Sequence, residues 1–190
     1  PARDRTPTPG PVELRVHPTL IPEKRLIANV DGVMNAVLVR GDAVGPTLYY
    51  GPGAGAEPTA SAVVADLVDV VRALTSDPEN RVPHLAFQPD AIAERPILPI
   101  DAVETAYYLR LQAVDRPGVL AEITRILGEE GISIEAMMQK EPPGSAPDSA
   151  TVIMLTQRVV ERSMNRAIER IEALDTVAGN VTRIRMETLG

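Results

Sequence analysis

The stretch Tyr107-Tyr-Leu-Arg-Leu-Gln-Ala-Val-Asp-Arg-Pro-Gly-Val-Leu120 decides the fold of the second half of this 190-residue chain. Its first eight residues alternate between two kinds of side chain, which predicts a β-strand with Tyr107 and every second residue to Ala113 on one face. Asp115-Arg-Pro-Gly118 then interrupts the alternation, and Pro117 suits the first turn of a helix because its missing N–H is not needed there. The stretch therefore predicts a strand, a tight loop and a helix.

Regular helix and strand patterns continue along the chain after Leu120. Apolar residues spaced three and four apart continue the helix to Leu127, and Gly131 suits a left-handed helix end. Strands are expected at 132–139, 150–156 and 181–187, and a second helix at 160–174. The order β-α-β-β-α-β predicts a four-stranded antiparallel sheet with both helices on one face.

Strict alternation along the strand 132–139 makes a specific prediction about its two faces. The residues expected to face the helices are Ile132, Ile134, Ala136 and Met138. The residues expected on the open face of the sheet are Tyr108, Arg110, Gln112, Ser133, Glu135, Met137 and Gln139.

The first half is less regular, since fourteen of the eighteen prolines lie in the first 99 residues. Residues 1–11 predict an irregular lead. Alternating or β-branched runs predict strands at 12–16, 33–39 and 47–50. A Gly-rich loop then leads into a helix whose apolar face runs from Val63 to Leu74, with Thr59 or Ser61 as its cap. We therefore expect a partial α/β region over 12–76, a Pro-rich connector over 77–100 and a separate domain over 101–190.

Composition excludes several classes of protein. The absence of cysteine removes disulfides, thiolate nucleophiles and cysteine metal sites, and two histidines cannot build a histidine-rich metal site alone. A net charge of −7, shared by both halves, argues against a nucleic-acid surface. The sequence has no apolar run long enough to cross a membrane, so a cytoplasmic protein without metal, membrane or nucleic-acid partners is expected.

The second half resembles an ACT domain, a small-molecule sensing module of amino-acid metabolism. Asp115-Arg-Pro-Gly-Val-Leu120 and Gly131-Ile-Ser-Ile134 carry the resemblance, which covers about residues 105–188. It implies an amino-acid effector site between paired domains. Its residues would be Asp115, Arg116, Pro117, Gly118, Val119 and Leu120, faced by Ile132, Ser133 and Ile134. The same residues also permit purely structural interpretations, in which Asp115 caps the helix and Gly118 allows close packing.

The first half resembles bacterial homoserine dehydrogenase over about residues 12–100. The matching segments stand in that family's order: Arg15-Val-His-Pro-Thr-Leu-Ile-Pro22, Val33-Met-Asn-Ala36, Gly41-Asp-Ala-Val-Gly45, Tyr50-Gly-Pro-Gly-Ala-Gly55 and Pro58-Thr-Ala-Ser-Ala-Val-Val-Ala-Asp66. The family also ends in an ACT domain. The resemblance implies NAD(P)-dependent interconversion of L-homoserine and L-aspartate 4-semialdehyde, threonine as effector, and a homo-oligomer.

One departure limits what the resemblance implies. The family's nucleotide-binding domain and catalytic lysine precede any segment found here. The chain has only two lysines, Lys24 and Lys140, and Lys24 lies outside the family's lysine motif. The chain therefore resembles a C-terminal portion of the enzyme. It is expected to hold no catalytic residue and to be inactive alone.

The Gly-rich loop permits three interpretations. Gly51-x-Gly53-x-x-Ala56 matches a dinucleotide fingerprint, but no second strand ending in an acidic residue follows about 20 residues later. A tight turn into a core helix needs the same glycines. The family resemblance adds a third interpretation, in which Gly51, Gly53 and Gly55 contribute contacts to a cofactor held mainly elsewhere.

The sequence thus predicts an α+β chain, a partial α/β region followed by a ferredoxin-like βαββαβ ACT domain. The leading hypothesis is a C-terminal portion of homoserine dehydrogenase. The alternatives are a non-catalytic amino-acid-sensing ACT module and a dimerisation fragment with no ligand.

Overall fold

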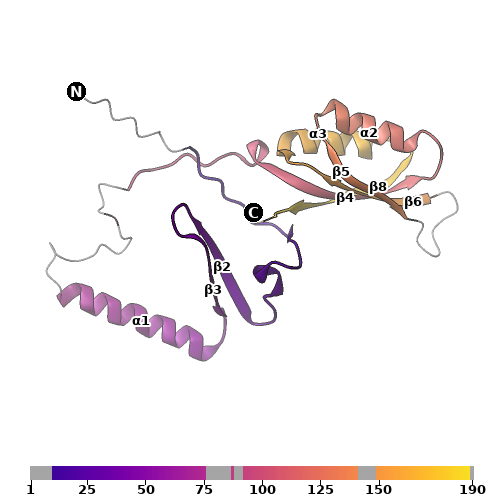
Figure 1. Ribbon diagram of the computed structural model, residues 1–190. Helices are drawn as coiled ribbons and strands as arrows, with labels where there is room; N and C mark the ends of the chain where they lie inside the picture. The colour runs from indigo at the N-terminus through magenta and orange to yellow at the C-terminus, as the bar shows by residue number, and fades with distance from the viewer. Residues whose placement is uncertain (1–9, 76–86, 88–91, 141–148, 189–190) are drawn as a thin grey trace, which may run out of the picture. The chain divides into compact units, whose positions relative to one another are not determined.

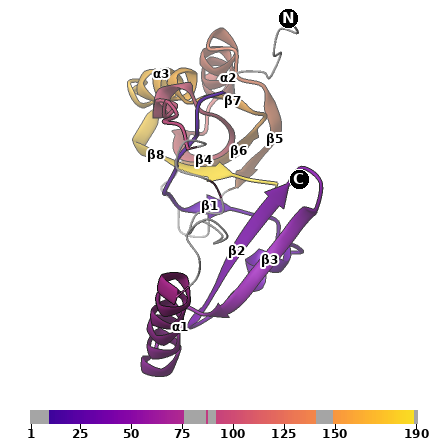
Figure 2. The same cartoon turned by 90° about the vertical axis from the view of Figure 1, so that its left-hand side faces the viewer.

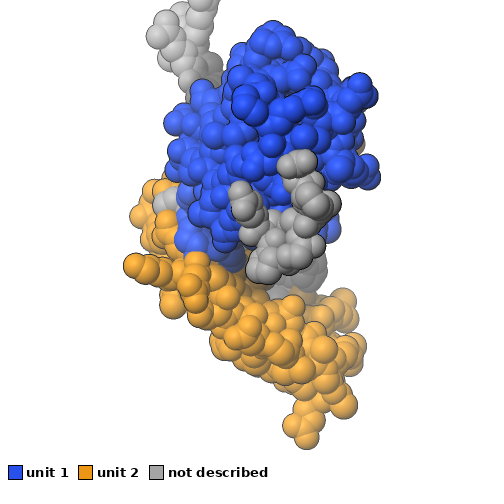
Figure 3. All heavy atoms as spheres, turned by 90° about the vertical axis from the view of Figure 1, so that its right-hand side faces the viewer, with its two compact units in different colours: residues 1–22, 95–190 blue, residues 23–94 orange. Residues whose placement is uncertain are grey.

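The computed structural model describes residues 10–75, 87, 92–140 and 149–188. Its chain divides into two compact units, residues 1–22 with 95–190 and residues 23–94 (Figure 3). The larger unit thus includes residues 1–22, which precede the smaller unit in the sequence.

The larger unit contains the predicted β-α-β-β-α-β order. Its elements are β4 (Glu104–Val114), α2 (Val119–Glu129), β5 (Ile134–Lys140), β6 (Ser149–Thr156), α3 (Glu161–Glu172) and β8 (Val177–Met186). The strands form a sheet in the order β8-β4-β6-β5, and these neighbours are all antiparallel. Both helices cover one face of this sheet (Figure 1). The α+β fold with an ACT-type arrangement is therefore confirmed.

Two short strands extend this sheet beyond the prediction. β1 (Thr19–Leu20) adds to the edge of β8 in parallel, and β7 (Val159–Val160) pairs with the start of β4. A run of two residues is too short to leave a periodic signal in the sequence.

The core lies between the sheet and the helices. The predicted inner face of β4 is buried, with exposed fractions of 4% or less from Tyr107 to Ala113. It packs against apolar side chains of both helices: Val119, Ile123, Ile126, Leu127, Met164, Ala167 and Ile171. The two helices lie side by side (Figure 2), where Arg166 and Arg170 form ion pairs with Glu130 at 2.8 and 3.0 Å.

A β-bulge overturns the predicted faces of β5. Ile134 pairs with Thr156 and Ala136 with Leu155, so Glu135 is an extra residue in the strand. An extra residue reverses the alternation beyond it. Met137 and Gln139 therefore share the helix-facing side with Met154 and Val152, whereas Ala136 and Met138 lie on the open face.

The predicted strand at 12–16 is wrong. Val12 makes only an isolated parallel bridge with Ile97, and the residues that follow it do not join a ladder. Leu14 and Val16 are largely exposed, so the alternation has no buried face to stabilise a strand.

The smaller unit contains a hairpin and a helix, as predicted. β2 (Met34–Gly41) pairs with β3 (Gly45–Pro52), and a short 3₁₀ helix, η1 (Leu26–Asn29), precedes them. α1 (Ala56–Thr75) begins before Thr59 and Ser61, so the prediction that either residue caps it is wrong. Pro58, which suits a first helical turn, lies just inside the helix start. α1 buries none of its residues.

A buried carboxylate joins three elements of the larger unit. Glu161, at the start of α3 and 2% exposed, accepts hydrogen bonds from Tyr107 of β4 at 2.6 Å and from Arg185 of β8 at 2.5 and 3.0 Å. Arg183 lies 3.2 Å away. Burial opposes ionisation of Glu161, but the hydrogen bonds from Arg185 and Tyr107 and the charge of Arg183 outweigh it, so its pKa lies below the ordinary value. Burial and the adjacent carboxylate raise the pKa of Tyr107.

Glu161→Gln tests this cluster. A carboxyl with a lowered folded pKa stabilises the fold above its ordinary pKa of 4.5, and the contribution is lost as the pH falls through the folded value. At pH 7 the variant should lose about 3 kcal/mol of unfolding free energy, the order expected when a buried pair loses one partner. Denaturant titrations at pH 7 and pH 3 measure it. An equal loss at both pH values would contradict the assignment.

Candidate functional site

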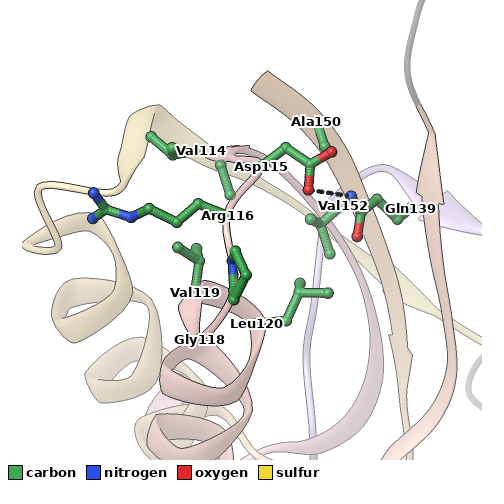
Figure 4. Close-up of a pocket in the computed structure, with 11 residues that line it drawn as sticks. Val114, Asp115, Arg116, Gly118, Val119, Leu120, Gln139, Ala150 and Val152 are labelled. Atoms are coloured by element: carbon green, nitrogen blue, oxygen red, sulfur yellow. Dashed lines mark hydrogen bonds between the residues drawn. The ribbon is translucent and has the colours of Figure 1, made fainter. Parts of the chain in front are cut away.

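A pocket of about 360 Å³ opens where β4 ends and α2 begins (Figure 4). This volume lies within the range of small-molecule sites. Its walls come from β4, the following loop, the first turn of α2, and strands β5 and β6. The lining residues are Ala113, Val114, Asp115, Arg116, Pro117, Gly118, Val119, Leu120, Gln139, Ala150 and Val152. Most are apolar, and the polar side chains gather in the loop and on β5.

Gly118 sets the path of the chain into α2. Its φ of 95° and ψ of −23° lie in the left-handed region, and it is the N-cap residue with no side-chain capping bond. A Cβ at Gly118 would meet no atom within 4 Å, so the glycine serves backbone conformation and the predicted close packing is wrong. The predicted cap by Asp115 is also wrong, and Pro117 precedes the N-cap. The first N–H groups of α2 thus lack a side-chain partner, a setting that favours an anion.

Asp115 has another partner. Its Oδ1 accepts a hydrogen bond of 3.0 Å from Nε2 of Gln139 on β5 (Figure 4). Arg116 contributes to the wall, but its guanidinium extends away from the Asp115–Gln139 pair. The polar end of the pocket is therefore built mainly of oxygen acceptors.

The predicted site residues divide into two groups. Asp115 to Leu120 all line the pocket, but Ile132, Ser133 and Ile134 do not. Ile134 pairs with Thr156, near the end of β6, whereas the pocket residues of β6 lie at its beginning. Ile132 is 4% exposed and belongs to the core. Within one copy of the chain, the 132–134 segment therefore lies at the opposite end of the sheet.

Gln139 was missed by sequence reasoning because the bulge reverses the faces of β5. Regular alternation assigns it to the open face, and only the extra residue at Glu135 turns it toward Asp115. Ala150 and Val152 follow from strand pairing, since Val152 is opposite Leu111 and Ala150 opposite Ala113.

Comparison with known proteins shows which enzymes this chain is similar to. The family model "Homoserine dehydrogenase" matches residues 4–68 and the model "ACT domain" matches residues 107–176. The homoserine dehydrogenase of Pseudomonas aeruginosa is 67% identical over 180 residues, 93% of this chain and 41% of that protein. The chain matches homoserine dehydrogenases. The enzyme of Neisseria gonorrhoeae is 56% identical over 94% of this chain and 40% of that protein.

A solved structure supports the assignment. The homoserine dehydrogenase of Thiobacillus denitrificans superposes with a TM-score of 0.86 at 67% identity, over 96% of this chain and 40% of that one. The chain thus spans about two fifths of the length of these homoserine dehydrogenases and matches a C-terminal portion of the family.

The structure itself explains why glycine stands at positions 51, 53 and 55 in the loop before α1. Gly51 is paired with Asn35 in the hairpin. A Cβ on Gly53 would lie 1.8 Å from Nδ2 of Asn35, and the Gly53 N–H donates to the carbonyl of Val33 at 3.1 Å. Gly55 has a φ of 124°. The loop is therefore a tight turn into α1.

Two other features were sought in the described part of the chain, a metal site and a membrane-spanning helix, and neither is found there. No cluster of three or more histidine, aspartate or glutamate side chains there could hold a metal ion. Among the same residues, no helix is both long enough and apolar enough to span a membrane.

Gly118→Ala tests the conformation of the pocket loop. The left-handed backbone should cost about 1–2 kcal/mol of unfolding free energy, although no atom obstructs the new methyl group. Gly128→Ala is the matched control: Gly128 lies within α2 and also has open space, so this change should stabilise the fold by about 0.5–1 kcal/mol. Thermal unfolding of both variants measures the difference, and equal effects would contradict the account.

Proposed function

We propose that the chain is a regulatory and partial catalytic portion of an NAD(P)-dependent homoserine dehydrogenase. The complete enzyme would interconvert L-homoserine and L-aspartate 4-semialdehyde in threonine, methionine and isoleucine biosynthesis, in the cytoplasm. High identity to homoserine dehydrogenases over nearly the whole chain supports this proposal.

The pocket at the β4–α2 loop is the observation that supports a regulatory role. An amino acid would place its carboxylate at the N–H groups of the first turn of α2, where the helix dipole favours negative charge. Its ammonium group would lie near the carboxylate of Asp115, and its side chain would contact the apolar wall. Threonine is the effector expected from the family, and its coupling to activity would be about 1–3 kcal/mol.

The smaller unit would contribute to the catalytic domain without supplying catalytic residues. Gly51, Gly53 and Gly55 would contact the nicotinamide end of a cofactor bound mainly by the part of the family's sequence that this chain does not span. The cofactor would supply hydride transfer.

An exposed apolar face on α1 supports incorporation into a larger assembly. Its residues are Val63, Val64, Leu67, Val70, Val71 and Leu74, each at least 50% exposed. A face of this kind marks a protein contact. The proposed contacts are the remaining catalytic domain or a second copy in a homo-oligomer.

An alternative function is a non-catalytic amino-acid-sensing module. The pocket is formed entirely by residues 113–152, so effector binding does not require the smaller unit. Cofactor binding distinguishes the dehydrogenase from the sensing module. Both would bind an amino acid, but only the dehydrogenase would also bind the nicotinamide cofactor once the remaining domain is supplied.

Calorimetry and an activity assay test the proposal on this chain. L-threonine should bind, NADPH should not bind measurably, and NADPH with aspartate semialdehyde should give no turnover above buffer. Adding a separately expressed nucleotide-binding half should restore NADPH binding. Ordinary turnover by the chain alone would contradict its incompleteness, and absence of binding by threonine or any other proteinogenic amino acid would contradict the sensing role.

A further inference from the structure

The Asp115–Gln139 pair has an orientation that chemistry dictates. A carboxylate accepts hydrogen bonds and does not donate them, so the amide nitrogen of Gln139 must face Asp115. The observed contact, Nε2 to Oδ1 at 3.0 Å, agrees. The amide oxygen then points away from Asp115 (Figure 4).

This orientation defines what the polar end of the pocket can bind. The Nε2 of Gln139 is engaged by Asp115, while Oε1 has no partner among the described residues. Asp115 retains a second oxygen as an acceptor. Two acceptors from neighbouring residues therefore face one end of a pocket whose remaining wall is mostly apolar. A ligand satisfies this end by bringing two hydrogen-bond donors, because an acceptor left unpaired on binding costs affinity.

We propose that Gln139 determines ligand specificity in this pocket, holding the Asp115 carboxylate and accepting a hydrogen bond from a donor on the side chain of the bound amino acid. The inference rests on the proposed sensing function and deepens it. The ligand class is a short amino acid with a side-chain hydroxyl. Its ammonium group pairs with Asp115, and its hydroxyl donates to Oε1 of Gln139.

The β-bulge makes this arrangement possible. Gln139 reaches the pocket only because Glu135 is an extra residue, and without it the side chain would lie on the opposite face of the sheet. The bulge thus places the polar amide of Gln139 in the otherwise apolar wall that β5 and β6 give the pocket.

L-threonine and L-valine are suitable probes because they are close in shape and differ by a hydroxyl in place of a methyl. The unmodified chain should bind threonine roughly tenfold more tightly than valine, since a tenfold difference is about 1.4 kcal/mol, within the range of one hydrogen bond. In Gln139→Met the wall becomes apolar, and such a wall discriminates weakly against a hydroxyl. The threonine-to-valine ratio should then fall to about one.

Gln112→Met is the matched control. It makes the same chemical change on the opposite face of the sheet, where Gln112 hydrogen-bonds to Thr151 at 2.8 Å. This variant should retain the native threonine-to-valine ratio. Gln139 is exposed on an edge strand, so Gln139→Met should fold normally, and circular dichroism checks this.

Isothermal calorimetry of the three proteins with both amino acids gives a decisive result. A ratio that collapses in Gln139→Met alone supports the assignment. A native ratio near one, or a ratio unchanged in Gln139→Met, overturns it while leaving the sensing function intact. Failure of the unmodified chain to bind any amino acid overturns both.

Discussion

Burial of one face of β4 beneath two helices constrains nearly everything else in the larger unit. Every second side chain from Tyr107 to Ala113 is almost fully buried, so the register of β4 cannot shift without exposing the whole set. That register fixes where the strand stops, at Val114, and hence where the loop and α2 begin. At the other end, the hydroxyl of Tyr107 meets Glu161 and attaches α3 to the same strand.

The pocket follows from two local departures from regular structure at the far end of this core. The left-handed backbone at Gly118 turns the chain into α2 without a side-chain cap. The bulge at Glu135 turns Gln139 toward Asp115. Neither feature adds to the apolar core. Both shape a polar surface beside it, as expected where a rigid scaffold presents a binding site.

Much of the fold and half of the candidate site could be predicted from the sequence. The order of elements follows from alternation and helical spacing, and the loop from Asp115 to Gly118 stands out by its Pro-Gly pair. The faces of β5 could not be predicted, because a single inserted residue leaves no periodic signal yet reverses every side chain after it. The strand at 12–16 failed for another reason: alternation indicates a strand only where a sheet buries one face, and Val16 is exposed.

The central claim is that the loop after β4, together with Gln139 of β5, forms the amino-acid site of this chain. The most direct measurement is a backbone NMR titration of the isotopically labelled chain with L-threonine. The account predicts saturable amide shifts concentrated at residues 113–120, 139 and 150–152. Shifts concentrated at the Gly51–Gly55 turn, or no saturable shift at any residue of the β4–α2 loop, would contradict it.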